Sequence, residues 1–396
     1  MEPSSTGLES RSVTGAAQAV SRTEPAETQP MEMPARRNPG QRLRSLDALR
    51  GFDMFWIIGG DYVARALPGI HDSPLTRACA AQMEHCEWAG FHFYDLIFPL
   101  FVFLAGVSLV FSISRTIERA GRKAAVRRIV IRSLLLFLLG IFYTGGIGNG
   151  FKNIYFAGVL HRIAVAYFFA ALIFCYFRPR TMVFICAALL VGYWVLMTWV
   201  PLPKIGPPDL SGPGKNLAHY LDELFLPGRR FEGSLLSTLA AVANCLLGVF
   251  AGLLLQNEKA SGRTKVRCLL AAGIISLVLG LAWGLQFPII KLLWTSSYVL
   301  VACGCSAILL AIFFQLIENW NLRLWAQPFV WIGMNAIAIY LLGSIVNFHR
   351  VAQRFVGGDI SAALGRYSEL AQALVTLALG LLVVRFLYRR QIFLRL

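Results

Sequence analysis

The sequence predicts an all-α protein, a polytopic membrane bundle of about ten transmembrane helices. Of its 396 residues, 57% are hydrophobic and only 15% are charged, whereas a soluble chain carries about 25% charged residues. The apolar residues gather in blocks close to the ~20 residues that a helix needs to cross a bilayer. The blocks are 51–67, 91–113, 129–147, 156–176, 181–200, 233–255, 267–287, 293–317, 328–347 and 369–387.

The basic residues predict how the bundle lies in the membrane. If the N-terminus is cytoplasmic and every block crosses, about two thirds of the 37 Lys and Arg residues fall on the cytoplasmic side. The net charge of +16 then reflects topology and attraction to anionic membrane lipid. Basic motifs with interleaved aromatic residues are missing, so nucleic acid is not a predicted partner. We expect a multi-pass protein of the cell inner membrane with both termini in the cytoplasm.

Two segments of different composition divide the chain. Residues 1–41 are rich in Ser, Thr, Glu, Ala, Pro and Arg and contain no apolar run of the length found in signal peptides. This composition is typical of a disordered segment, here a cytoplasmic tail. Residues 42–396 form one transmembrane domain.

The first block has polar residues at both ends. Asp47 and Arg50 precede it at the cytoplasmic mouth, Asp53 lies inside it, and Asp61 lies toward its exterior end. Asp47 and Arg50 fit either a salt bridge that anchors the helix or a site for an anionic ligand. Ionisable groups within a membrane span cost roughly 2.5–3.5 kcal/mol each, so they are functional candidates by default.

The exterior loop 68–90 runs into the second block through "MEHCEWAGFHFYDLIFP". It carries His85 and Trp88, and the block itself contains Asp95. Pro99 lacks the N–H that would bond to the carbonyl of Asp95, so that carbonyl needs another partner. Cys79 and Cys86 lie in the same exterior loop, so a disulfide between them stays open. Neighbouring residues such as those of "EHCE" seldom converge on one ion, so no metal is predicted.

Later blocks add further candidates. His161 and Arg162 lie in the fourth block, where Arg162 is a candidate to neutralise Asp95. Glu232, directly before the sixth block, and Lys291 lie at span edges. The Pro- and Gly-rich loop 201–232 has the composition of a lid. No nucleotide-binding or serine-hydrolase motif occurs in its required context.

Six ordered motifs resemble one family. They are "RLRSLDALRGFDMFWIIGGD" followed by "QMEHCEWAGFHFYDLIFPLFVFLAG", then "GVLHRIAVAYF", "EGSLLSTLAAVANCLLGVFAG", "LWTSSYVL" and "PFVWIGMNAIAIYLL". The chain resembles, from about residue 42 to its end, the transmembrane acyltransferases of the heparan-α-glucosaminide N-acetyltransferase family and their bacterial glucosamine N-acetyltransferase relatives. It departs from them at "RFEG", where members often read Asp-Pro-Glu-Gly, and in lacking a lumenal domain.

The resemblance implies a reaction and roles for residues. Acetyl-CoA, a co-substrate bound from the cytoplasm, would donate its acetyl group to the amino group of a glucosamine-type sugar on the far side. The family's catalytic histidine corresponds to His85, and Asp61 stands where the lysosomal enzyme often has Asn. Asp61 and Asp95 are candidates to assist His85. Arg50 and Asp47 are the candidates for binding the co-substrate, and Trp88, His161, Arg162 and Glu232 are those for binding the sugar.

The chemistry suits a histidine, because an ammonium group must lose a proton before it attacks a thioester. A positioned general base contributes about 10²–10⁴ in rate, and histidine exchanges protons near neutral pH. An acetyl-histidine intermediate is the competing role. Two other functions stay open: a transporter with proton-relay acids, and a related sugar O-acyltransferase. The natural acceptor and the association of two copies as a homodimer also stay open.

Overall fold

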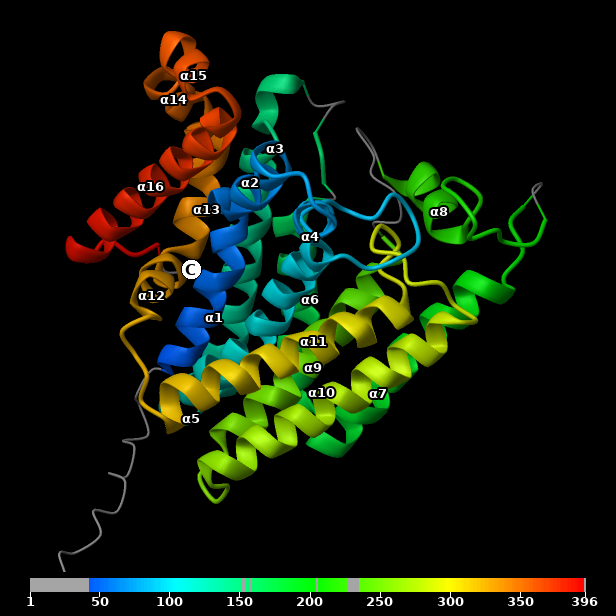
Figure 1. Cartoon of the computed structure of the whole chain (residues 1–396). Coiled ribbons are helices and arrows are strands. Elements are labelled where there is room, and N and C mark those ends of the chain that lie inside the picture. The colour runs from blue at the N-terminus through cyan, green and yellow to red at the C-terminus, as the bar shows by residue number, and fades with distance from the viewer. Residues whose placement is uncertain (1–42, 151–153, 157, 204–205, 227–234, 395–396) are drawn as a thin grey trace, which may run out of the picture. The chain divides into compact units, whose positions relative to one another are not determined.

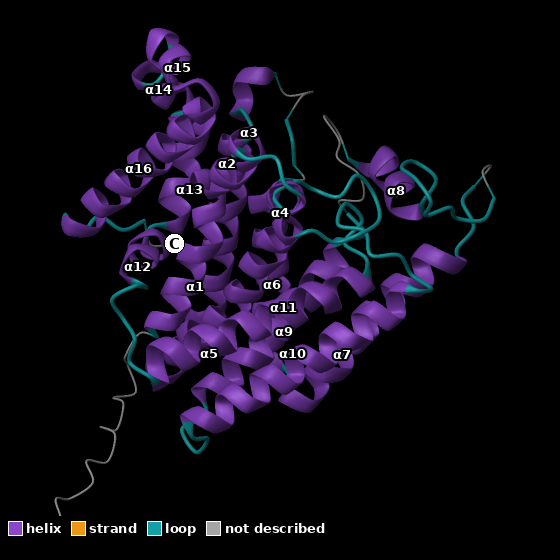
Figure 2. Cartoon of the chain, viewed as in Figure 1, coloured by secondary structure: helices purple, strands orange, loops and turns teal. Residues whose placement is uncertain are grey.

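The structure is a computed structural model that describes residues 43–394, apart from 151–153, 157, 204–205 and 227–234 (Figure 1). The chain divides after Arg42 into two units, and only the second is described. The expected cytoplasmic tail therefore lies outside the described residues. Figure 2 shows the described chain as helices joined by loops, with isolated bridges as its only extended pairing.

The long helices follow the predicted blocks. They are α1 (Arg44–Phe55), η1 (Trp56–Gly60) and α2 (Asp61–Arg65) in one run, then α5 (Ile97–Tyr143), α6 (Val159–Tyr176), α7 (Pro179–Trp199), α9 (Thr238–Gln256), α10 (Gly262–Gly284), α11 (Ser296–Phe314), α12 (Gln327–Met334), α13 (Ala336–Ile345) and α16 (Ser368–Arg389). Shorter helices join them: α3 (Leu67–Ile70), α4 (Pro74–Ala81), η2 (Phe93–Leu96), η3 (Gly146–Asn149), α8 (Leu217–Phe225), η5 (Gln315–Asn319), α14 (Phe348–Phe355), α15 (Gly358–Leu364) and η6 (Gly365–Tyr367).

The helix α5 contains two of the predicted spans. Gly121, with φ 78° and ψ 172°, interrupts the helical backbone. Arg128 donates a hydrogen bond of 3.0 Å to the hydroxyl of Thr116. Twelve residues of straight helix would separate these positions by about 18 Å, so the chain folds back at Gly121 and forms an antiparallel pair.

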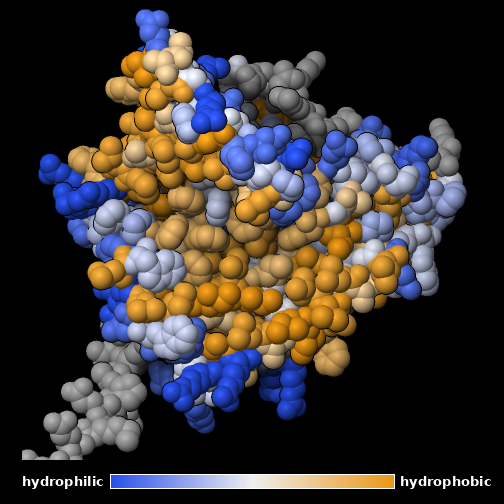
Figure 3. All heavy atoms as spheres, in the orientation of Figure 1, coloured by the Kyte–Doolittle hydropathy of each residue, from blue (hydrophilic) through white to orange (hydrophobic). Residues whose placement is uncertain are grey.

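The predicted fold class is confirmed. Within the described residues, seven helices are long and apolar enough to cross a membrane, or eight if α12 and α13, bent by 72° at Asn335, form one span. The hairpin within α5 and the run α1–η1–α2 account for the remaining predicted spans. Figure 3 shows a broad hydrophobic band with polar residues above and below it. Outward-facing residues such as Phe184, Ile275 and Leu382 suit contact with lipid.

The two polar ends hold different elements. In Figure 1 the beginning of α1 and the turn between α9 and α10 lie at the lower end, and α2, α3, α4, α8, α14 and α15 lie at the upper end. Inside, α5 packs on α6 and α9, and α10 packs along α11. The assignment of the lower end to the cytoplasm remains a prediction.

Glycines hold α1 directly against α12. A methyl group on Gly51 would lie 1.7 Å from the carbonyl oxygen of Phe329, and one on Gly333 would lie 1.8 Å from that of Asp47. Real side-chain carbons do not approach so closely, so only glycine allows this backbone contact. The contact fixes α1, which carries Asp47, Arg50 and Asp53.

Candidate active site

The residues before α5 bring His85 onto Asp95. The segment is not a continuous helix: Gly90 has a φ of 135°, and its N–H donates to the carbonyl of Ile289 at 2.9 Å. The chain therefore turns back, and His85 Nδ1 lies 2.9 Å from Asp95 Oδ1. The imidazole of His85 is 52% exposed whereas the Asp95 side chain is fully buried, so a buried acid holds a histidine that solutes can reach.

Asp95 is held from several directions. Its Oδ2 accepts hydrogen bonds from the backbone N–H groups of Cys86 (3.3 Å) and His92 (3.0 Å). Its backbone carbonyl accepts a bond of 2.7 Å from the hydroxyl of Tyr298. This is the partner that the carbonyl needs because of Pro99, which lies in the first turn of α5. The carboxylate therefore has little freedom to move away from His85.

Lys291 completes the cluster. It lies in the turn between α10 and α11, and its Nζ is 3.2 Å from Asp95 Oδ1. The same Nζ lies 2.7 Å from Nδ1 and 3.0 Å from Nε2 of His85, so a cation rests against the imidazole. Burial lowers the pKa of Lys291 from its ordinary value of 10.5, and the neighbouring Asp95 opposes this shift. In the sequence, Lys291 is distinguished only by its place at a span edge.

A cavity of about 380 Å³ extends from this cluster into the bundle. His85, Lys291 and Tyr94 are polar residues in its wall, and most of the remaining wall is apolar, with residues such as Phe98 and Ile337. A volume above ~300 Å³ with apolar walls and few polar groups is typical of a small-molecule site.

Asp53 from α1 also lines the cavity. Its side chain is fully buried, and neither carboxylate oxygen has a hydrogen-bond partner in the described part of the chain. An ionised carboxylate in such a place costs several kcal/mol. Asp53 therefore either carries a proton or takes a partner from whatever fills the cavity.

Asp61 does not contact His85 directly, and the side chain of Tyr94 lies between them. Its Oδ2 pairs with Arg65 at 3.2 Å, and the guanidinium of Arg65 lies 5.6 Å from the ring centroid of Tyr94. The ring of Tyr94 in turn lies against that of His85, with centroids 4.9 Å apart. Asp61 thus reaches His85 through Tyr94, whereas Asp95 contacts it directly.

The candidate co-substrate residues lie near the start of α1. Arg50 Nη1 pairs with Asp47 Oδ1 at 3.2 Å, and Arg50 Nη2 donates to the hydroxyl of Ser108 on α5 at 2.8 Å. The expected salt bridge is therefore present. These contacts hold the guanidinium between α1 and α5. They are compatible both with a salt bridge that anchors α1 and with a site for an anionic ligand.

Two of the candidate sugar-binding residues, Trp88 and His161, are not among the residues that line the cavity. Trp88 donates a bond of 2.7 Å to the carbonyl of Leu210, which ties two loops together. His161 accepts a bond of 3.2 Å from the N–H of Gly158 and packs edge-on against Phe137 on α5.

Arg162 lies behind the cavity wall. Its guanidinium stacks 4.8 Å from the ring centroid of Trp294 and 5.9 Å from that of Phe98. The proposed neutralisation of Asp95 by Arg162 is wrong, since the ion pairs of Asp95 within the described residues are with His85 and Lys291. Glu232 lies outside the described residues.

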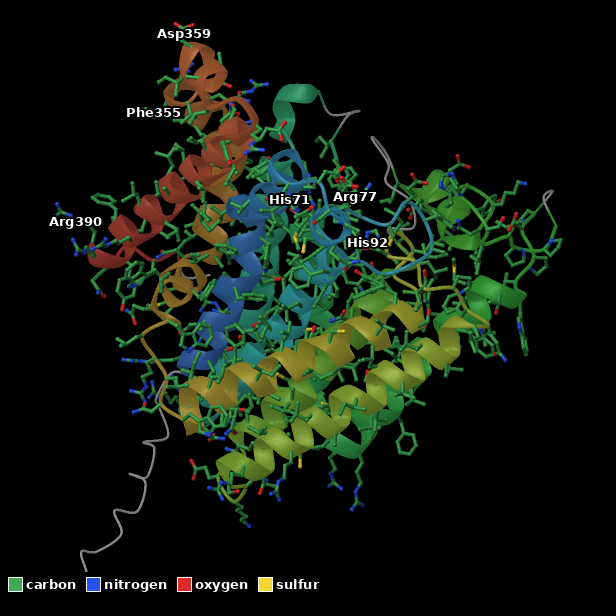
Figure 4. The ribbon with its side chains drawn as sticks, in the orientation of Figure 1. His71, Arg77, His92, Phe355, Asp359 and Arg390 are labelled. Carbon is green, nitrogen blue, oxygen red and sulfur yellow. The ribbon has the colours of Figure 1, made fainter. Side chains whose placement is uncertain are left out.

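The ligand atoms of Cys86, His92 and Asp95 lie within 4.8 Å of one another. Figure 4 shows His92 close to α4 at the upper end of the bundle. Burial and the charge of Asp95 raise the pKa of Cys86, which favours the thiol over the thiolate that metals bind. Asp95 already accepts two backbone hydrogen bonds. The grouping of these three side chains is therefore explained by hydrogen bonding to Asp95 and does not require a metal ion. Cys79 and Cys86 are both free thiols.

Comparisons with known proteins agree with the motifs. A family described as "Heparan-alpha-glucosaminide N-acetyltransferase, catalytic" matches residues 42–220, which include His85 and Asp95. The mouse heparan-alpha-glucosaminide N-acetyltransferase is 26% identical over 426 residues, covering 90% of this chain and 61% of the relative. The human protein is also 26% identical, covering 89% and 59%. The chain thus spans about 60% of the length of these relatives. The chain is therefore similar to the heparan-alpha-glucosaminide N-acetyltransferases, and its residues 42–220 match the catalytic region of that family.

Proposed function

We propose that the protein is an integral-membrane acetyltransferase. It moves an acetyl group from cytoplasmic acetyl-CoA to the amino group of a glucosamine-type sugar on the exterior face. The observation that carries this proposal is the cluster of His85, Asp95 and Lys291 at one side of an apolar cavity. The names of the mouse and human relatives support the same chemistry.

His85 acts as the general base. Asp95 fixes the orientation of the imidazole through Nδ1, at 2.9 Å. Nε2, which lies 3.0 Å from the Nζ of Lys291, takes a proton from the sugar amine. As the amine attacks the thioester carbon, the new C–N bond forms and the C–S bond breaks. The proton on His85 then passes to the departing CoA sulfur, so the imidazole returns to its starting state. Acyl transfer through His85 itself is the alternative route.

Lys291 stabilises the charge that develops during transfer. The thioester oxygen becomes an oxyanion when the amine attacks, and the ammonium of Lys291 is held within 3.0 Å of both ring nitrogens of His85. A fixed cation at this point is the arrangement that acyl-transfer sites use to lower the barrier. Asp61 acts more remotely, through Tyr94.

The donor and the acceptor reach His85 from opposite sides. The exposed face of the imidazole is open to a sugar, and the apolar cavity suits the long uncharged arm of CoA. The phosphates of CoA bind near Arg50, since a guanidinium favours phosphate oxygens. This arrangement requires both termini to be cytoplasmic. Labelling of single cysteines placed at residue 10 and within 206–215 should report opposite sides, and labelling from one side would refute this topology.

The test is acetyl transfer by the purified protein. Radiolabelled acetyl-CoA with glucosamine should give N-acetylglucosamine, and N-acetylglucosamine offered as the acceptor should remain unmodified. Acetylation of N-acetylglucosamine would instead show an O-acyltransferase. Sugar uptake into proteoliposomes without any acetyl transfer would show a transporter.

A further inference from the structure

Asp53 is the polar group of the cavity that the proposed chemistry leaves without a role. Its carboxyl is fully buried, lines the cavity, and has no hydrogen-bond partner within the described residues. The cavity residues around it on α1 are Met54 and Ile57, which offer no hydrogen bond. A buried polar group without a partner is costly, so an occupant that supplies one gains affinity at this point.

The depth of Asp53 indicates which part of an occupant it meets. Asp53 precedes Asp61 by eight residues along α1 and η1. Their separation along the chain axis is at most about 12 Å, the rise of a straight α-helix, because η1 is a π-helix interrupted at Gly59. Asp61 marks the level of the reacting end, because Tyr94 approaches it and also packs against His85. In an extended pantetheine arm the second amide lies roughly 10 Å from the thioester carbon, from bond lengths of about 1.3–1.5 Å. The two lengths agree.

We propose that Asp53 recognises the pantetheine arm of the acyl donor by a hydrogen bond to its second amide. This assignment rests on the proposed function and adds a specificity-determining residue to it. An uncharged amide suits the place, since the surrounding wall is apolar and a neutral hydrogen bond leaves no charge buried. The rest of the arm, with its methyl groups, fits the apolar wall.

Two acetyl donors of different length distinguish a contact at the second amide from contacts nearer the thioester. Acetyl-pantetheine contains both amides, whereas S-acetyl-N-acetylcysteamine ends after the first. Asp53→Leu should raise the KM for acetyl-pantetheine by about 10-fold to 100-fold, as expected for a lost hydrogen bond to a buried group. It should leave the KM for the short donor within about threefold. Asp53→Asn keeps a donor and an acceptor of hydrogen bonds and should behave like the wild type with both donors.

The control is Ile337→Val, which removes one methyl group from the same cavity and should affect both donors alike. Asp53→Ala gives the same comparison if the leucine variant does not fold. Equal changes for the two donors in the Asp53 variants, or a raised KM for the amine alone, would overturn the assignment. Absence of transfer by the wild type would instead refute the proposed function. In that case the loss of CoA-dependent thermal stabilisation in Asp53→Leu still tests the contact.

Discussion

Replacing Lys291 by methionine tests whether the cation at His85 takes part in transfer. The substitution keeps a flexible side chain of similar length and removes the ammonium that lies 2.7 Å from His85 Nδ1 and 3.2 Å from Asp95 Oδ1. Asp95 keeps its contacts with His85 and with two backbone N–H groups. The protein is therefore expected to fold while its site loses one charge.

The structure sets the scale of the effect. Two unit charges 3.2 Å apart interact by about 5 kcal/mol at an effective dielectric constant of about 20. The Lys291 side chain is 19% exposed, so water screens part of this attraction. Because Asp95 keeps its other partners, the expected loss of stability is about 1–3 kcal/mol. A fixed donor to an oxyanion contributes about 10²–10³ in kcat. We therefore expect kcat for acetyl transfer to fall by about 10²–10³.

The assay is steady-state transfer from acetyl-CoA to glucosamine by purified variants, with thermal unfolding measured on the same samples. Lys215→Met is the matched control: it makes the same charge change on an exposed side chain of the loop 206–216, away from the cavity. This control should stay within about 0.5 kcal/mol of the wild type in stability and keep its rate. A kcat for Lys291→Met within threefold of the wild type would refute the role given to the cation.

Three further substitutions probe the cluster and the candidate co-substrate site. Tyr298→Phe leaves the carbonyl of Asp95 without its 2.7 Å donor and should cost about 1–3 kcal/mol, seen as earlier thermal unfolding; an unchanged transition would contradict this. Lys291→Arg tests the lowered pKa: transfer by the wild type should decline on the alkaline side below 10.5, as Lys291 loses its proton, and arginine should move that decline upward. Arg50→Ala should raise the KM for acetyl-CoA and not that for the amine; a drop in protein yield with an unchanged KM would favour the anchor formed with Asp47.

The spans could be predicted because membrane solvation acts on whole segments. Each apolar block needs an internal hydrogen-bonding pattern in lipid, so its length alone indicates a helix. The need of the Asp95 carbonyl for a partner was equally predictable, because Pro99 removes a donor at a fixed offset. The identity of that partner, Tyr298, depends on packing between helices that are about two hundred residues apart.

The candidate site was predictable in part. His85 and Asp95 stand ten residues apart, but their contact depends on the turn at Gly90, whose N–H bonds to Ile289. Lys291 enters from the same distant turn, so spacing along the chain could not indicate it. Its signals were its charge at a span edge and its place just before "LWTSSYVL". Trp88 and Arg162 are of residue types common in binding sites, but neither lines the cavity. Trp88 bonds to the loop carbonyl of Leu210, and Arg162 stacks on the ring of Trp294.

The decisive measurement for the catalytic role of His85 is the rate of acetyl transfer by His85→Ala, compared with the wild type in the same membrane preparation. The His85 side chain is 52% exposed, so its loss should leave the unfolding temperature near that of the wild type. If His85 is the general base, transfer from acetyl-CoA to glucosamine should fall by at least ~10², the lower bound for a positioned general base. A His85→Ala protein that still transfers acetyl at close to the wild-type rate would contradict this role.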